Sequence, residues 1–83
     1  MWYVYILRSQ SSPDQAGATE DLKRRLNEHN SSKSAHTSKF VPWEIAWYCA
    51  FPEKYQALEF ETYLKSHSGR AFARKRLLHP TVT

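Results

Sequence analysis

The chain has 83 residues, and its 12 Lys and Arg outnumber its 8 Asp and Glu to give a formal net charge of +4 at pH 7. This length fits one domain with a single hydrophobic core, and the basic balance favours a polyanionic partner such as nucleic acid. The single Cys49 excludes an intramolecular disulfide, and the apolar run at residues 1–7 is too short for a signal peptide or a membrane span, which indicates a cytoplasmic protein outside the membrane.

Residues 2–7 are predicted to form a strand at the centre of a sheet. They are mostly aromatic and β-branched, with no helical period and no Gly or Pro. Both faces of this strand are apolar enough to be covered, and the hydroxyl of a buried tyrosine on it would need a polar partner. The two faces would carry Trp2, Val4 and Ile6 on one side and Tyr3, Tyr5 and Leu7 on the other.

A turn and a short returning strand are predicted next. Residues 9–14 hold three Ser, one Pro and one Asp, a composition typical of turns. Residues 15–19 can then return as the second arm of a hairpin. Gly17 in this arm indicates either a close backbone approach or a positive φ.

The first helix is predicted to follow, with Thr19 as its cap, acidic residues in its first turn and its end at Asn30. At about 100° per residue, Arg25 and His29 project from the side that carries the two leucines of this helix. Charged groups normally lie opposite the apolar stripe, so this pair indicates a polar cleft and a candidate site. The alternative is that Arg25 lays its aliphatic stem over the core edge and His29 is a hydrogen-bonded histidine at the core rim.

A polar loop and a second strand are predicted after this helix. Residues 30–39 are rich in Ser and contain Lys33, His36 and Lys39, so they should form an exposed loop. Residues 43–51 then form a strand that follows Pro42. Its apolar face would carry Trp43, Ile45, Trp47, Cys49 and Phe51.

The second helix is predicted over residues 53–66. Glu61 falls inside the apolar arc of this helix, and Lys65 lies at the border of the arc. A carboxylate in an apolar arc is costly unless it is paired or bound to a cation, so Glu61 is either the partner of a buried Arg or Lys or a metal ligand. Glu59 points outward and serves as an internal control.

A basic third helix is predicted over residues 70–78, after a break at residues 66–69. Pro80 prevents its further extension. The cations of this helix, Arg70 and Arg74 among them, would either bind nucleic acid or form an ordinary solvated face.

The order of these pieces resembles the GIY-YIG nuclease domain, in particular its small single-domain bacterial members. Residues 3–5 (Tyr-Val-Tyr) look like the first motif, and residues 15–17 (Gln-Ala-Gly) stand at the place of the second motif, of which they keep the glycine. Arg25 and His29 match the family spacing in the helix that follows. Glu61 matches the glutamate that binds metal in this family. The resemblance covers residues 3 to about 77.

The resemblance implies an α/β (α+β) fold, in which a small three-stranded, mostly antiparallel sheet is flanked by about three helices. The domain would occupy residues 1–79, followed by a short tail at residues 80–83. The implied activity is hydrolysis of DNA phosphodiester bonds with one divalent cation, Mg²⁺ or Mn²⁺. The expected site residues are Glu61 for the metal, Tyr5, Arg25, His29 and Lys65 for catalysis, and Gly17 for structure. The basic character of the chain adds Lys23, Lys33, His36, Lys39, Arg70 and Arg74 as residues expected to bind nucleic acid.

These residue types suit that chemistry. Glu61 would hold a hard cation through oxygen, and Arg25 would brace the nonbridging phosphate oxygens. Tyr5 would position or deprotonate the attacking water, and His29 would assist the proton transfer or orient the phosphate. Lys65 would add positive charge beside the scissile group.

Two departures from the family pattern keep a second function open. Gln15 stands where the family has a tyrosine, and an amide can form hydrogen bonds but cannot act as an acid or base. Many family members also carry an asparagine near the end of the domain, which this chain lacks. The alternative is therefore a catalytically weakened or inactive nucleic-acid-binding module. A zinc site is disfavoured because the four His and Cys49 lack paired ligand spacing, and the oligomeric state stays open.

Overall fold

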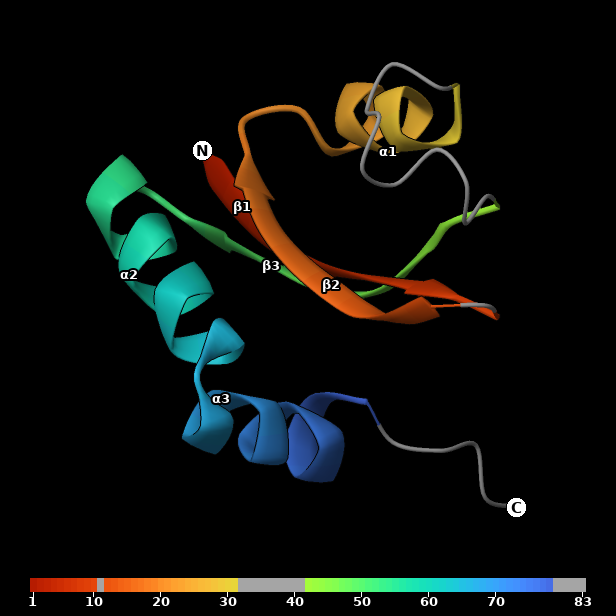
Figure 1. The fold of residues 1–83 in the computed structure, drawn as a ribbon. Coiled ribbons are helices and arrows are strands. Elements are labelled where there is room, and N and C mark those ends of the chain that lie inside the picture. Colours follow the sequence, from red (N-terminus) through yellow and green to blue (C-terminus); the bar gives the residue numbers. More distant parts are fainter. Residues whose placement is uncertain (11, 32–41, 79–83) are drawn as a thin grey trace.

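The computed structural model describes residues 1–10, 12–31 and 42–78, and it contains a three-stranded antiparallel sheet with helices on both faces (Figure 1). In chain order the elements are β1 (Trp2–Ser9), β2 (Ser12–Thr19), α1 (Leu22–Asn30), β3 (Glu44–Phe51), α2 (Lys54–Lys65), α3 (His67–Phe72) and the π-helical turn η2 (Ala73–Leu77). The strand order β2-β1-β3 confirms the predicted α+β class and the central position of β1. Among the described residues, no helix has the length and apolar character needed to cross a membrane.

The β1–β2 hairpin is tighter than the sequence predicts. We expected a turn over residues 9–14, but β1 continues to Ser9 and β2 begins at Ser12, and these two residues pair. Pro13 does not prevent this pairing because β2 is an edge strand, where one face of the backbone needs no partner. The hairpin also carries an ion pair between Arg8 Nε and Asp14 Oδ1 at 3.7 Å.

Helix α1 begins two residues later than predicted, and its cap is Asp21 instead of Thr19. The Asp21 carboxylate accepts a hydrogen bond from the backbone N–H of Arg24 at 3.0 Å. Thr19 is buried, and its hydroxyl accepts from the backbone N–H of Asp21 at 3.1 Å. Thr19 therefore shapes the turn between β2 and α1, and Asp21 satisfies the first turn of the helix.

A β-bulge in β3 divides the apolar face that we expected to be continuous. Ile6 pairs with Trp47, but the next residue, Leu7, pairs with Ile45, so Ala46 is an extra residue. One extra residue reverses the alternation of side chains on a strand. The prediction of one common face was therefore wrong, because Trp43 and Ile45 pack on the α1 face whereas Trp47, Cys49 and Phe51 pack on the α2 face.

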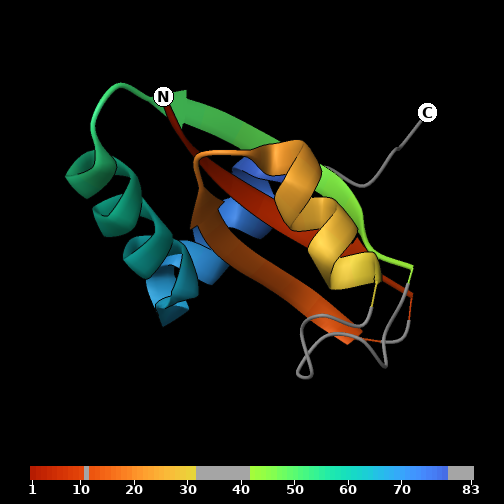
Figure 2. The same cartoon turned by 90° about the horizontal axis from the view of Figure 1, so that it is seen from above.

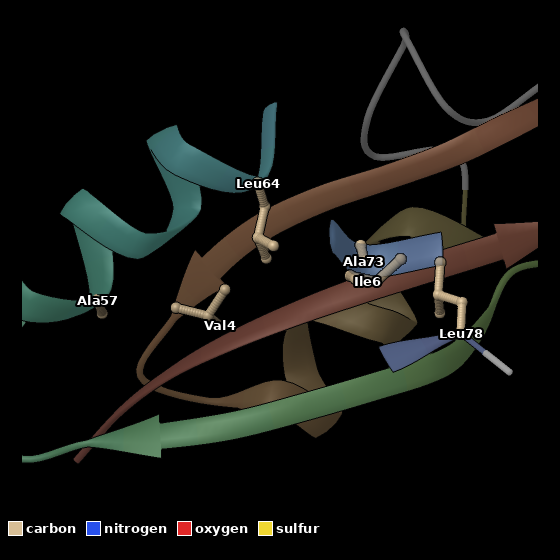
Figure 3. Close-up of a cluster of buried hydrophobic side chains, with 6 residues drawn as sticks. All are labelled: Val4, Ile6, Ala57, Leu64, Ala73 and Leu78. Carbon is tan, nitrogen blue, oxygen red and sulfur yellow. The ribbon is translucent and has the colours of Figure 1, made fainter. Parts of the chain in front are cut away.

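The helices cover opposite faces of the sheet. On one face, Leu22 and Leu26 of α1 pack against a small cluster of Tyr5, Leu7 and Trp43. On the other face, α2, α3 and η2 enclose a larger cluster, shown in Figure 3, of Val4, Ile6, Ala57, Leu64, Ala73 and Leu78. Figure 2 shows α1 in front of the sheet, with the blue α3–η2 segment behind it.

The predicted break at residues 66–69 is present but shorter, because α2 ends at Lys65, Ser66 is extended and α3 already starts at His67. The Ser66 hydroxyl caps α3 by accepting from the backbone N–H of Gly69 at 3.0 Å, and it donates to the Tyr63 carbonyl at 2.6 Å. A Cβ on Gly69 would collide with the Tyr63 carbonyl oxygen and would lie 2.8 Å from Leu64 Cα. Gly69 therefore allows α3 to pack tightly on α2, and it does not interrupt the helix.

Candidate functional site

Tyr5, Arg25 and His29 meet on the α1 face of the sheet. Tyr5 comes from the central strand and is 4% exposed, and its hydroxyl accepts a hydrogen bond from Arg25 Nε at 3.4 Å. The same hydroxyl lies 3.4 Å from Nε2 of His29, which is 6% exposed. Two residues one turn apart on α1 thus converge on one phenol, as their helical spacing predicts. We call these three residues the Tyr5 cluster.

Gly17 gives the Tyr5 side chain the room it needs. Gly17 pairs with Tyr5 across β1 and β2. A Cβ on Gly17 would collide with the Tyr5 hydroxyl and would lie 2.5 Å from Cζ of the ring. Of the two sequence-based interpretations of this glycine, the geometry favours the close approach, since its φ lies outside the left-handed region.

Two further interactions support the cluster, and neither is among the contacts predicted from the sequence. Arg25 Nη1 donates to Glu28 Oε1 at 3.1 Å, and the i,i+3 spacing of this pair is a signal that the sequence offered. The Asn30 amide accepts from the Trp43 backbone N–H at 2.6 Å and donates to the Trp43 carbonyl at 3.0 Å. No sequence signal predicts this second contact, which fixes the Trp43 ring 6.4 Å from the ring of His29.

The electrostatics of the cluster favour a neutral imidazole beside a guanidinium cation. Burial lowers the pKa of His29 below its ordinary value, the positive charge of Arg25 lowers it further, and Glu28 acts in the opposite direction. The hydrogen bond to Tyr5 raises the pKa of Arg25, burial opposes this effect, and the bond to Glu28 adds to it. At neutral pH, His29 is therefore able to accept a proton while Arg25 stays charged.

The lowered pKa of His29 predicts a loss of stability in mild acid. The unfolded chain, in which the imidazole has its ordinary pKa of about 6.5, binds the proton more readily than the folded chain. The stability contributed by neutral His29 is therefore complete above about pH 6.5 and is lost as the pH falls through that value towards the folded pKa. We expect the melting temperature of the protein to fall over this range, and to fall less in a His29→Gln variant. A His67→Gln variant, changed at an exposed position, controls for the loss of a histidine as such.

Glu61 and Lys65 form a separate pair on α2. Lys65 Nζ lies 2.7 Å from Glu61 Oε2, and the two side chains are 55% and 19% exposed. Since α2 covers the face opposite to α1, none of the contacts described within residues 1–10, 12–31 and 42–78 joins Glu61 to the Tyr5 cluster. The structure therefore brings together three of the five residues that we expected at the catalytic centre, and places the other two beside each other.

The remaining predicted residues lie at the surface or outside the described part of the chain. Lys23 is exposed on α1. Arg70 and Arg74 are exposed and, together with Lys65 and Gln15, line a pocket on the α2 face. Lys33, His36 and Lys39 lie outside the described residues.

The donor set available to a metal is small. Within the described residues there is no group of three or more His, Cys, Asp or Glu that could enclose a metal ion. Glu61 nevertheless offers a single, partly exposed carboxylate. This fits Mg²⁺, which keeps several waters and is often bound by one or two carboxylates together with substrate phosphates.

Comparisons with known proteins agree with this architecture. A family model described as the GIY-YIG catalytic domain matches residues 1–76. UPF0213 proteins from Vibrio campbellii and Aeromonas hydrophila are 37% identical over 65 residues and 35% identical over 80 residues, which are 77% and 95% of this chain. The matches cover 62% and 58% of those two proteins, so the chain spans about three fifths of their length. The solution NMR structure of a UPF0213 protein from Bacillus halodurans is 30% identical with a TM-score of 0.60, covering 96% of this chain and 89% of that one.

Proposed function

Because this chain belongs to the GIY-YIG catalytic domain family, we propose that it is an endonuclease that hydrolyses DNA phosphodiester bonds with one divalent cation, Mg²⁺ or Mn²⁺. The observation that carries the proposal is the Tyr5 cluster. In it a neutral imidazole and a partly exposed guanidinium each lie within hydrogen-bond distance of one buried phenol. Phosphodiester hydrolysis needs a proton acceptor for the attacking water and positive charge for the phosphate, and the cluster supplies both.

Arg25 would bind the scissile phosphate. Its Nε is engaged by Tyr5 and its Nη1 by Glu28, but its side chain is 40% exposed and a guanidinium has five N–H donors. The remaining donors can therefore reach the nonbridging oxygens of a phosphate at the surface. Tyr5 and Glu28 hold the guanidinium in place before the substrate arrives, which lowers the cost of ordering it.

Tyr5 and His29 would handle the proton of the attacking water. As the new bond between water oxygen and phosphorus forms and the bond to the leaving oxygen breaks, the Tyr5 hydroxyl orients the water. Nε2 of His29, 3.4 Å from that hydroxyl, takes the proton. Burial keeps this imidazole neutral at pH 7 and therefore ready to accept it.

Glu61 would hold the cation, and Lys65 beside it would add positive charge. When bound, the cation would stabilise the leaving oxygen and the charge on the phosphate. Glu61 comes from the other face of the sheet. However, α2 also contacts the edge strand β2, whose Gly17 is paired with Tyr5 on β1. A DNA strand that contacts Arg25 on α1 would therefore have to pass round the β2 edge to reach Glu61 on α2.

Metal removal tests the proposal directly. Purified protein should nick supercoiled plasmid in Mg²⁺ or Mn²⁺, stop when EDTA is added, and resume when the cation is restored in excess. Gel electrophoresis separates the supercoiled and nicked forms. Nicking that continues in EDTA, or its absence with every divalent cation over a panel of duplex, branched and single-stranded DNA, would refute the enzymatic assignment.

An Arg25→Gln variant should lose on the order of 10²-fold of the nicking rate. Glutamine keeps much of the length of the side chain but removes the charge and the paired donors. The matched control is Arg24→Gln, which removes the same charge from the next position, where the side chain is exposed. Equal losses in the two variants would show that only the overall charge of α1 matters.

A non-catalytic nucleic-acid-binding module is the second candidate. It is favoured by Gln15, which lacks a titratable proton, and by the pairing of Glu61 with Lys65. This candidate predicts DNA binding that weakens with salt, needs no metal and leads to no cleavage.

A Gln15→Tyr variant separates the two candidates. If the chain is a weakened nuclease, the added phenol should raise the nicking rate by up to about 10²-fold, the contribution of one positioned acid or base. Gln15→Phe is the control, because it adds the ring without the hydroxyl. If the chain is only a binding module, neither variant will cleave DNA.

A further inference from the structure

A pocket of about 510 Å³ lies on the α2 face of the sheet, among β2, α2, α3 and η2. Its floor is apolar and includes Ile6, Leu64 and Leu78, which belong to the larger core cluster. Its rim carries three cations, Lys65, Arg70 and Arg74. The volume lies within the range of about 300–1,000 Å³ that small-molecule sites occupy. Neither Tyr5 nor Arg25 lines this pocket, so it is separate from the Tyr5 cluster.

The rim has a surplus of positive charge. Lys65 is paired with Glu61, and Asp14, the acidic residue of the lining, is paired with Arg8 at 3.7 Å. Arg70 and Arg74 form no ion pair with any residue that the structure describes. They are four positions apart in continuous helix, so their side chains lie on the same side and can share one anion.

An apolar floor beside two available guanidiniums suits a ligand with one apolar part and one anionic part. A phosphate monoester carries about −1.5 to −2 charges at pH 7 and offers three acceptor oxygens, which matches a pair of arginines better than a single diester charge does. A nucleobase or sugar can cover the apolar floor.

We propose that this pocket binds a nucleotide with a terminal phosphate monoester, with the phosphate on Arg70 and Arg74 and the base against the apolar floor. The nucleotide is either a free nucleoside monophosphate or the phosphorylated end of a strand, since both present the same chemistry. Binding here does not depend on hydrolysis at the Tyr5 cluster, so the test is carried out in EDTA, where the proposed nuclease is inactive.

The first measurement is titration with thymidine 5′-monophosphate, followed by calorimetry and by NMR of the backbone amides. We expect saturable binding with one site per chain. Thymidine lacks the phosphate and inorganic phosphate lacks the nucleoside, so each should bind with an affinity at least about tenfold lower. The amide signals of Gln15, Lys65, Arg70 and Arg74 should shift, and that of Arg25 should not. Binding that does not saturate, or shifts centred on Arg25, would overturn the proposal.

The second measurement compares two double variants with equal charge. Arg70→Gln/Arg74→Gln should weaken binding of thymidine 5′-monophosphate by at least about tenfold. Lys75→Gln/Arg76→Gln removes two charges from the same segment at exposed positions outside the lining and should change the affinity by less than about twofold. Equal losses would mean that the basic surface attracts anions without a defined site.

An Ala16→Val variant tests the pocket without any change in charge. Ala16 lines the pocket, and a larger side chain would narrow it. We expect weaker binding of thymidine 5′-monophosphate with an unchanged response to inorganic phosphate. Circular dichroism checks that the variant is folded. If the folded variant and the original chain bind the nucleotide with equal affinity, the base does not lie against the apolar floor, and that part of the proposal is wrong.

Two oligonucleotides identify the source of the nucleotide. They share one sequence, and only one carries a 5′-phosphate. Tighter binding of the phosphorylated one, lost in Arg70→Gln/Arg74→Gln, supports the proposal and assigns the pocket to strand ends. Equal binding of the two oligonucleotides alongside saturable binding of thymidine 5′-monophosphate supports it and assigns the pocket to the free nucleotide.

Discussion

A Glu61→Gln variant is expected to nick plasmid on the order of 10³-fold more slowly than the original chain. In the proposed nuclease, Glu61 supplies the carboxylate that holds the cation, and glutamine has nearly the same size but no negative charge. The side chain is 19% exposed, and its described side-chain partner is Lys65 at 2.7 Å, so the substitution leaves the core clusters unchanged. The rate is measured from the conversion of supercoiled to nicked plasmid at saturating Mg²⁺.

Glu59→Gln is the matched control for this variant. It removes the same charge from the same helix at an exposed position two residues away, and its nicking rate should stay within about twofold of the original. A second readout is the concentration of Mn²⁺ that gives half of the maximal rate, which should rise in Glu61→Gln and not in Glu59→Gln. Full activity of Glu61→Gln at low metal concentration would place the cation elsewhere.

A Gly69→Ala variant is expected to lower the free energy of unfolding by about 3 kcal/mol or more. The added methyl group would meet backbone atoms of α2, namely the Tyr63 carbonyl oxygen and Leu64 Cα, and backbone cannot move aside as a flexible side chain can. For a chain of this size, a loss of about 3 kcal/mol lowers the melting temperature by about 12–24 °C. Thermal unfolding followed by circular dichroism measures the shift.

Ser68→Ala is the control for Gly69→Ala. It changes the neighbouring, exposed residue of α3 and should alter the free energy of unfolding by no more than about 0.5 kcal/mol. If Gly69→Ala proves as stable as Ser68→Ala, then α2 and α3 can separate without cost, and their close approach is not part of what stabilises the fold.

The sequence predicts most elements of the fold because their signals are local. The alternation at residues 2–7 and the helical spacing of Arg25 and His29 depend only on neighbours along the chain. The bulge at Ala46 does not, because it is fixed by how β3 pairs with β1, and it reverses the faces of Trp43 and Ile45. The sequence predicts Gly69 within a break between helices, but it lies inside α3, and the contact that requires a glycine there is with α2.

The difference between local signals and contacts made by distant elements also explains which site residues could be predicted to lie together. Helical periodicity places Arg25 and His29 on one side of α1, and the apolar character of β1 places Tyr5 in a covered layer. Periodicity also places Glu61 on the inner side of α2, but it does not tell which face of the sheet α2 covers. That choice depends on packing over the whole domain, and it separates Glu61 from the Tyr5 cluster in the described contacts.

The paired hydrogen bonds between the Asn30 amide and the Trp43 backbone join the end of α1 to the residue that precedes β3. These hydrogen bonds hold Trp43 beside His29 without using any residue of the connection itself. Lengthening such a connection twofold costs only about 0.6 kcal/mol in closure entropy. A connection of another length can therefore replace this one at little cost in stability, because the two hydrogen bonds at its base do not involve it.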